Sequence, residues 1–431
     1  MISYDNLFFY NVEIITLEYN LRFSEYTKVW KSTKIGEIAE VVGGGTPKTE
    51  IEEYWNGEIK WFTPSEIGKT KYIFDSERYI TENGLKNSSA KLLPKDTILL
   101  SSRATVGEIS IALTECSTNQ GFQSLITKNT VDNEFIYYLI STMKNEFLRR
   151  SSGSTFLEIS KNEIKRIPIN IPELSEQNKI SNLFSAIDDK IEMLEKKCRY
   201  YQDFKNYLMQ QIFAQKLRFA DCTDEWKVCK FKDLGTVKSG VGFSNKYQGH
   251  LDLDYNVYKV SDMNLKGNEK VMTKSNNTID DNILNDMGAK LIREPSIIFA
   301  KVGEAIFLNR KRIAKPHFLI DNNMMAFSPN NNVDLEFMYY LTTSINFGKY
   351  AQTGALPSYN ASDIYSIKCK IPPLEEQKRI GNLLSLADNK INNCSNQINN
   401  VLNFKRGLLQ QMFDNVRLVL NLIINEHIYH L

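Results

Sequence analysis

The sequence predicts an α+β protein in which two α+β domains are separated and joined by two long antiparallel coiled-coil helices, as a pseudo-two-fold internal repeat. Three observations predict this fold class. The sequence occurs twice, the best-matched repeated blocks are long helical stretches, and the segments between them alternate short strand and loop patterns. With 431 residues, the chain is long enough for two or three domains that each bury a core.

The internal repeat is clearest in two pairs of segments. The segment 171–177 (IPELSEQ) recurs at 371–377 (IPPLEEQ), and this offset of 200 residues holds without a gap as far as Phe213 and Phe413. A second match, at an offset of 196 residues, joins Leu21, Arg22, Phe23 and Trp30 to Leu217, Arg218, Phe219 and Trp226. Because the offset changes between these blocks, insertions occur there, as loops accept and cores do not.

The predicted organisation is therefore domain, helix, domain, helix. The boundaries are 1–21 for an N-terminal segment, 22–172 for the first domain, 173–216 for the first long helix, 217–372 for the second domain, 373–416 for the second long helix and 417–431 for a C-terminal tail. The two terminal segments show no match to the repeat.

Both long helices carry apolar residues at alternating steps of four and three, which is the heptad pattern of a coiled coil. The seam consists of Ile180, Phe184, Ile187, Ile191, Leu194, Cys198, Tyr201, Leu208 and Ile212, and of Ile380, Leu384, Ala387, Ile391, Cys394, Ile398, Val401, Leu408 and Met412. Both copies break at the same place, at Lys205 and Lys405.

Local signals also predict where the helices begin and how they pair. Pro172 and Pro372 mark the entry, since the residue before a proline disfavours helix, and Ser175 is the predicted N-cap. At 1.5 Å per residue, each helix is about 60 Å long. Two helices that lie separately on their own domains are the alternative. The symmetric halves favour an antiparallel pair that serves as a rigid strut.

The segments between the helices have the pattern of short strands joined by exposed loops. Gly43–Pro47 is a glycine-rich loop, and 91–101 is a turn followed by a buried strand that recurs at 294–301. The segment 63–70 (TPSEIGKT) resembles a phosphate-binding P-loop, but Thr63 stands where the first glycine is required. We therefore exclude ATP binding there.

Composition excludes several classes of protein. The hydrophobic share of 42% and the charged share of 24% are ordinary for a globular protein, and the longest apolar stretches are too short to span a membrane. A secretory signal is lacking, which predicts a cytoplasmic protein without a membrane partner. The cysteines at 116, 198, 222, 229, 369 and 394 show neither a disulfide framework nor zinc-ligand spacing, so no metal is expected. The net charge of +2 provides no argument for nucleic-acid binding.

No set of residues for catalysis is found in the sequence. It has no Asn-Pro-Pro-Tyr-like motif for adenine methylation, no helicase motif and no nuclease cluster. The four histidines, at 250, 317, 427 and 430, lie only in the second half or the tail and cannot belong to a repeated active site. We interpret the repeated module as a binding protein and not as an enzyme.

The ordered motifs resemble those of specificity subunits of type I restriction-modification enzymes over nearly the full length. The matching features are Trp30, Gly43–Pro47, 102–107 (SRATVG), 119–122 (NQGF), 153–155 (GST) and the duplicated IPxLxEQ and QQxF motifs. The second domain departs from the pattern. Its segment 299–303 (FAKVG) lacks the arginine found at Arg103, which fits two domains that read different bases.

The resemblance implies that each α+β domain is a target recognition domain that reads one half of a bipartite double-stranded DNA sequence. It also implies that the helices set the spacing and dock two methyltransferase subunits, which assemble with motor-nuclease subunits. S-adenosylmethionine, ATP and magnesium would then be used by these partners, and no cofactor is expected in this chain.

Candidate DNA contacts follow from the chemistry of base reading. Arginine pairs most often with guanine and Asn or Gln with adenine, whereas Lys, Ser and Thr mainly contact phosphates. The candidates are Thr46, Lys48, Ser102, Arg103, Thr105, Gln120, Ser154 and Thr155 in the first domain, and Ser239, Lys246, Lys301, Asn322, Asn323, Ser358 and Asn360 in the second. Small polar loop residues more often bond their own turn. Trp30, Trp226, Tyr138 and Tyr340 are expected in the core.

Two other functions remain open at the level of sequence. The alternative is a non-catalytic coiled-coil scaffold for protein assembly without nucleic acid, and a solitary methyltransferase or nuclease is a third. DNA binding should weaken steeply with salt through counterion release, whereas the scaffold should be insensitive to salt.

Overall fold

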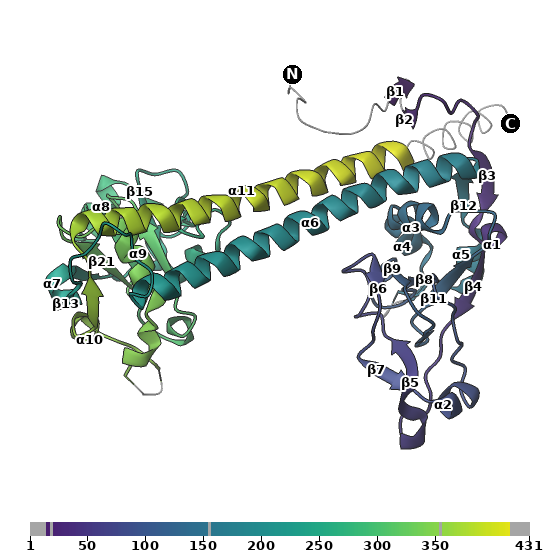
Figure 1. Ribbon diagram of the computed structural model, residues 1–431, viewed down its shortest axis with the longest axis horizontal. Helices are drawn as coiled ribbons and strands as arrows, with labels where there is room; N and C mark the ends of the chain where they lie inside the picture. The colour runs from purple at the N-terminus through teal and green to yellow at the C-terminus, as the bar shows by residue number, and fades with distance from the viewer. Residues whose placement is uncertain (1–13, 18–19, 154–156, 353–355, 414–431) are drawn as a thin grey trace. The chain divides into compact units, whose positions relative to one another are not determined.

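The computed structural model describes residues 14–17, 20–153, 157–352 and 356–413 (Figure 1). The chain divides into two compact units, 1–194 with 397–431 and 195–396. Each unit therefore contains one α+β domain and part of each long helix. The predicted C-terminal tail lies outside the described residues. No helix within the described ranges has the length and apolar character that a membrane span requires.

The first domain consists of short strands and helices, as predicted. Its elements are β1 (Ile14–Leu17), β2 (Asn20–Phe23), β3 (Lys31–Lys34), α1 (Ile35–Ile38), β4 (Ala39–Gly43), η1 (Glu52–Tyr54), β5 (Trp55–Phe62), β6 (Tyr72–Ile73), β7 (Arg78–Ile80), α2 (Glu82–Lys86), β8 (Ile98–Leu100), β9 (Ile109–Ala112), β10 (Ser117–Thr118), β11 (Gln123–Thr127), α3 (Asn133–Ser141), α4 (Lys144–Arg150), α5 (Lys161–Arg166) and β12 (Pro168–Ile171).

The second domain repeats this order with small changes. Its elements are β13 (Lys227–Lys230), α7 (Phe231–Leu234), β14 (Gly235–Ser239), η2 (Asn245–Tyr247), β15 (Tyr255–Tyr258), η3 (Val260–Asn264), β16 (Val271–Met272), β17 (Thr278–Ile279), α8 (Asp281–Asp286), β18 (Ser296–Ala300), η4 (Glu304–Ile306), β19 (Lys311–Ala314), β20 (Leu319–Ile320), β21 (Met324–Pro329), α9 (Leu335–Ser344), η5 (Phe347–Tyr350), α10 (Ala361–Tyr365) and β22 (Lys368–Ile371).

The two domains share one sheet topology. A five-stranded sheet has the order β4-β11-β8-β9-β6 in the first domain and β14-β21-β18-β19-β16 in the second. A second sheet has three strands, β10-β5-β7 in the first domain and β20-β15-β17 in the second, and a further pair joins β3 to β12 or β13 to β22. Strands β1 and β2 form a separate antiparallel pair. Strands β8 and β18 are fully buried, as the segments 91–101 and 294–301 predicted. The α+β class and the internal repeat are therefore confirmed.

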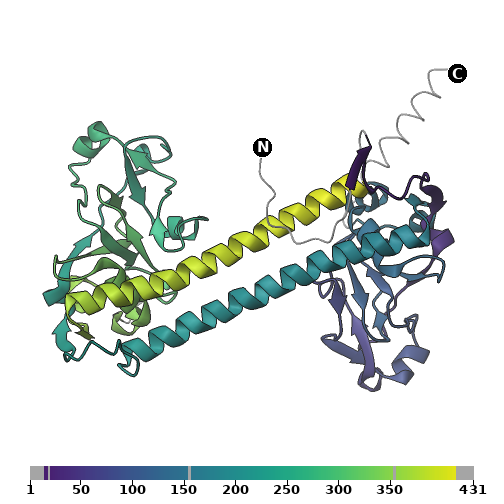
Figure 2. The same cartoon turned by 45° about the horizontal axis from the view of Figure 1, so that its top comes forward.

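Two helices of 40 residues each, α6 (Leu174–Phe213) and α11 (Leu374–Phe413), connect to these domains. In the first unit they lie side by side, with the rings of Phe184 and Phe413 stacked at 6.0 Å and Lys405 paired with Asp188 (Figures 1 and 2). In the second unit Lys205 lies 2.5 Å from Asp388. Residue numbers rise along α6 as they fall along α11, so the predicted antiparallel pairing is confirmed within each unit.

The lysine positions that interrupt the apolar seam do not interrupt the helices. Lys205 and Lys405 lie inside α6 and α11, and each pairs with an aspartate of the other helix. An ion pair there replaces an apolar contact, which explains why both copies of the heptad pattern skip the same position.

The predicted N-cap is wrong by two residues. Helix α6 begins at Leu174, so Ser175 lies in its first turn, where the hydroxyl donates to the carboxylate of Glu173 at 2.9 Å. The carbonyl of Glu173 accepts the N–H groups of Glu176 and Gln177. The helix therefore begins directly after Glu173, two residues earlier than a serine N-cap at 175 predicts.

One core position holds an apolar residue in the first domain and a lysine in the second. Ile109 and Lys311 occupy matching places in β9 and β19, each two residues before the matched pair Ile111 and Ile313. Ile109 is an apolar core residue, whereas Lys311 is a lysine that is only 2% exposed and donates to the carbonyl of Ile345 at 2.9 Å. Burial lowers the pKa of Lys311 to about 7.

We predict that the Lys311→Met variant is more stable than the wild type at neutral pH and loses this advantage in alkali. Because the pKa of Lys311 is lowered from 10.5 to about 7 on folding, the unfolded chain binds more protons between these values. Wild-type stability therefore rises with pH across this window, by up to about 1.4 kcal/mol per pH unit. Urea unfolding of both proteins at several pH values measures the difference, and a gap that does not change with pH would contradict the prediction.

Candidate nucleic-acid interface

The two repeated sequence motifs meet where each long helix leaves its domain. In the first unit, the guanidinium of Arg22 donates two hydrogen bonds of 2.6 Å to the carboxylate of Glu176, and the indole N–H of Trp30 donates to it at 3.2 Å. The same contacts recur at 2.7 to 3.3 Å among Arg218, Glu376 and Trp226 in the second unit. The matched Leu-Arg-Phe and tryptophan positions are therefore partners of the glutamate in the IPxLxEQ motif.

The glutamine of the same motif makes a second link. Gln177 donates from its amide to the carbonyl of Pro172 at 2.8 Å and accepts the backbone N–H of Asp132 at 2.9 Å. Asp132 in turn caps α3. Gln377 repeats these contacts with Pro372 and Asp334, which caps α9. The motif thus joins the start of each long helix to the start of a helix in the domain.

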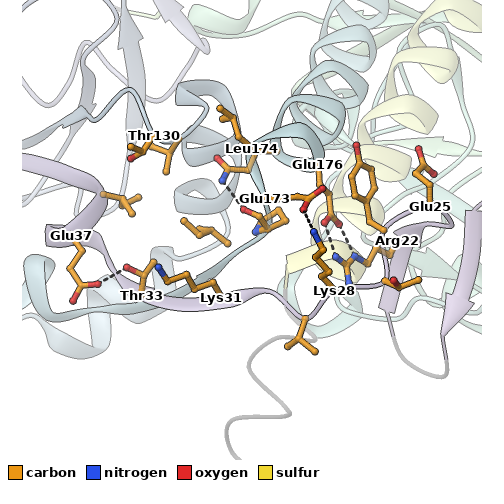
Figure 3. Close-up of a pocket in the computed structure, with 18 residues that line it drawn as sticks. Arg22, Glu25, Lys28, Lys31, Thr33, Glu37, Thr130, Glu173, Leu174 and Glu176 are labelled. Carbon is orange, nitrogen blue, oxygen red and sulfur yellow. Dashed lines mark hydrogen bonds and ion pairs between the residues drawn. The ribbon is translucent and has the colours of Figure 1, made fainter.

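A pocket of about 740 Å³ lies beside this joint in the first unit (Figure 3). Figure 3 shows that several of its charged side chains face one another. Lys28 lies 3.0 Å from Glu173, and Arg22 is engaged by Glu176. We interpret this pocket as part of the joint, because these charges are compensated within the protein.

A second polar network joins each domain to both long helices. Lys71 lies 2.8 Å from the hydroxyl of Tyr138 and 3.0 Å from that of Ser185, and Tyr138 donates to Asp188 at 2.7 Å. The complete sets are Lys71, Glu134, Tyr138, Ser185, Asp188 and Lys405 in the first unit, and Lys270, Glu336, Tyr340, Ser385, Asp388 and Lys205 in the second. Burial raises the pKa of Tyr138 and of Tyr340 above the ordinary range, so both hydroxyls remain donors.

This network was missed at the level of sequence. The tyrosines and aspartates recur in the repeat, but Tyr138 and Tyr340 were assigned only to the core, where both are indeed fully buried. Trp226 is buried and Trp30 half-buried, as expected. The sequence signal that could have revealed the network is that Asp188 recurs as Asp388 and that each otherwise apolar seam contains one lysine, Lys205 or Lys405.

The candidate DNA contacts of the first domain lie on loops that meet. Thr46 follows β4 and donates to Gln120, which precedes β11. The glycines of this loop permit close packing, since a Cβ on Gly44 would lie 2.0 Å from the carbonyl oxygen of Asn119. Lys48, Arg103, Thr105 and Gln120 are exposed.

Three other candidates of the first domain have a different outcome. Ser102 is fully buried, so its side chain does not reach the surface, and we withdraw it as a DNA contact. The physical reason is that its backbone N–H is bonded to Gly121, which holds it beneath the loop. Ser154 and Thr155 lie outside the described residues.

In the second domain most candidates gather in the corresponding place, and several make contacts within the protein, Lys301 and Ser358 through their backbones. Lys301 bonds through its N–H to the carbonyl of Asn323, and Ser358 bridges the adjacent Val302. Asn323 also bonds Asp321 within its own turn, and Asn360 caps α10. Ser239 and Asn322 are exposed, whereas Lys246 lies elsewhere, on η2, and pairs with Asp286 at 3.0 Å.

The chain has two copies of one α+β domain on the same two long helices, and the copies carry loops of different chemistry. These features are typical of a protein with two different binding sites. A family model described as the type I restriction modification DNA specificity domain matches residues 27–198 and again 223–403. The chain belongs to this family.

Individual relatives agree with this assignment. The MjaIX type I restriction enzyme specificity subunit of Methanocaldococcus jannaschii is 33% identical over 407 residues, which cover 89% of this chain and 93% of the relative. The EcoR124I/EcoR124II specificity subunit of Escherichia coli is 28% identical over 201 residues, 42% of this chain and 49% of the relative.

Solved structures show the same fold. The S subunit of a type I restriction-modification system from M. genitalium aligns with a TM-score of 0.53 at 16% identity, over 90% of this chain and 97% of that one. A chain from a structural study of complex assembly and conformational transition in the type I R-M system aligns at 0.59 and 14% identity, over 90% and 98%.

We predict that Tyr138→Phe and Tyr340→Phe each destabilise their own unit by about 1–2 kcal/mol, because each removes one hydroxyl from a buried network. Hydrogen exchange should accelerate around α3 for the first variant and around α9 for the second. Tyr79→Phe is the matched control, since its hydroxyl bonds Asp75 at an exposed site. Equal effects of all three substitutions would contradict a structural role for the network.

Proposed function

We propose that this chain is the DNA-reading subunit of a type I restriction-modification complex. Each α+β domain reads one half of a bipartite double-stranded DNA target, and the chain directs partner subunits to that target. The observation that supports this most strongly is that the DNA specificity model matches both copies of the domain in one chain.

The distribution of differences between the two domains supports the same function. The joints are kept, since Arg22, Trp30 and Glu176 have direct counterparts in the second unit. The loops are not kept. Gly45 and Val241 make the same backbone contact, but the next residues are Thr46 in one domain and Gly242 in the other. A scaffold that repeats one surface gains nothing from such divergence, whereas a reader of two different half-sites requires it.

Partners supply the chemistry in this proposal. Two methyltransferase subunits dock on the long helices and motor-nuclease subunits join them, and these partners use S-adenosylmethionine, ATP and magnesium in the cytoplasm, while this chain itself is not catalytic. Large apolar side chains exposed on α6 and α11 support such docking, because they would otherwise remain in water. They are Leu174, Met193, Tyr200, Phe204, Tyr207, Leu386, Leu402 and Phe404.

We predict that the affinity of the chain, assembled with its methyltransferase subunits, for double-stranded DNA falls steeply with salt. Contacts to phosphates release counterions, so a protein that contacts six or more phosphates loses roughly a thousandfold in affinity between 50 and 200 mM salt. Fluorescence anisotropy with a labelled duplex measures this dependence. Absence of DNA binding, together with normal assembly of the subunits, would favour the scaffold instead.

We also predict that exchange of residues 22–172 for the matching domain of a relative changes one half of the DNA target and leaves the other half unaltered. A donor domain that keeps the arginine and tryptophan of the joint should dock on Glu176 and Gln177 as the native domain does. Mapping of methylated adenines in cells that carry the hybrid and the partner subunits shows the result. A target changed in both halves would contradict independent reading.

A further inference from the structure

Arg78 on β7 is held in one orientation by two tryptophans. Its guanidinium carbon lies 3.7 Å from the ring centroid of Trp55 and 5.3 Å from that of Trp61. The two rings meet edge to face at 5.1 Å and are only 8% and 3% exposed. A planar cation stacked on a buried aromatic pair is already ordered, so it loses little freedom when it binds a ligand.

Within the part of the chain that the structure describes, this guanidinium donates no hydrogen bond to a protein acceptor. Arg78 is exposed, and among the described residues its side-chain contacts are those with the two rings, without a carboxylate partner. This distinguishes it from Arg22 and Arg218, whose donors are used within the joints. A guanidinium offers five N–H donors in a fixed fork, and here they remain available for a ligand.

The two tryptophans tie Arg78 to the loop that carries other candidate DNA contacts. The indole N–H of Trp61 donates to the carbonyl of Gly45 at 2.9 Å, and that of Trp55 donates to the carbonyl of Lys48 at 3.1 Å. Thr46, between these two residues, bonds Gln120. Arg78 is therefore connected, through the two tryptophans, to the loop that carries Thr46 and Lys48.

The second domain has no such arrangement at the matching place. In the first domain Trp61 lies opposite Arg78 in the β5–β7 pair. In the second domain Val257 and Asn277 take these two places, and the N–H of Val257 bonds the carbonyl of Asn277. Asn277 is 6% exposed, and its side chain accepts the N–H of Gly249. The second domain forms the same pair of strands without an arginine at this place, so the shared fold does not require Arg78.

We propose that Arg78 reads a guanine in the half-site of the first domain, with its fork of donors on the N7 and O6 acceptors in the major groove. This pairing is the commonest specific contact of arginine with DNA. Lys48 and Thr46, on the loop that the two tryptophans bond, have the chemistry to hold phosphates. The inference rests on the proposed function and adds to it a named base and the residue that reads it.

The test is selection from a random duplex library by the full chain assembled with its methyltransferase subunits, at one fixed salt concentration. Wild-type protein should select a bipartite motif with a guanine in the half-site of the first domain. Arg78→Met should lower the preference for that guanine about tenfold or more and leave the other half-site unchanged. Arg78→Lys should lose it as well, because an ammonium does not form the fork.

Lys60→Met is the matched control. Lys60 lies on β5, beside β7, and its amine is also over an aromatic ring, 4.2 Å from the ring centroid of Phe74. It should leave the motif intact. Tryptophan fluorescence checks that Trp55 stays packed in each variant. If Arg78→Met unfolds the domain, Arg78→Lys, which keeps a cation over the ring, decides the question.

Several results would overturn the inference. If Arg78→Met weakened binding to all DNA sequences equally, and if the affinity then depended on salt with a slope smaller by about one ion, Arg78 would contact a phosphate instead. An unchanged motif in both Arg78 variants, or a motif without guanine in that half-site, would remove its reading role while the proposed function stands. If the wild-type complex selects no motif at all, the proposed function fails together with this inference.

Discussion

A buried carboxylate at the start of each long helix is the constraint on which the rest of each unit depends. Glu176 is fully buried and Glu376 is 3% exposed. A carboxylate removed from water costs several kcal/mol unless it is paired and hydrogen-bonded, so an arginine and a tryptophan from the domain must be in place. Each domain is thereby attached to its helix in one orientation, and the adjacent glutamine extends the attachment to α3 or α9.

This attachment separates what must stay constant from what can change. The joints and the Lys71 and Lys270 networks lie where domain and helices pack, and both units keep them. The loops at the ends of β4, β8 and β11, and of their counterparts, do not attach the domains to the helices, and they differ between the two domains. Binding specificity can therefore diverge within one chain without a change in how either domain is held.

The two domains also differ in where each has a particular basic side chain, Lys311 in the second domain and Arg78 in the first. Lys311 occupies a core position that Ile109 fills in the first domain, and its burial lowers its pKa. Arg78 instead lies on the surface, stacked over buried rings, where its donors stay exposed. We expect the first arrangement to lower the stability of the domain at neutral pH, whereas the second leaves the donors of a guanidinium exposed.

By itself the sequence determined the two-fold repeat, the two long helices, the buried strands and the family, because periodicity and repeated motifs are local patterns along the chain. It misplaced the N-cap at Ser175 and offered Ser102 as a surface residue, since neither the helix start nor burial is decided by neighbouring residues alone. The contacts of Glu176 with Arg22, of Tyr138 with Asp188 and of Arg78 with Trp55 were decided only by the tertiary structure. Each joins side chains from different elements, and only the packing of helices and sheets brings such groups within bonding distance.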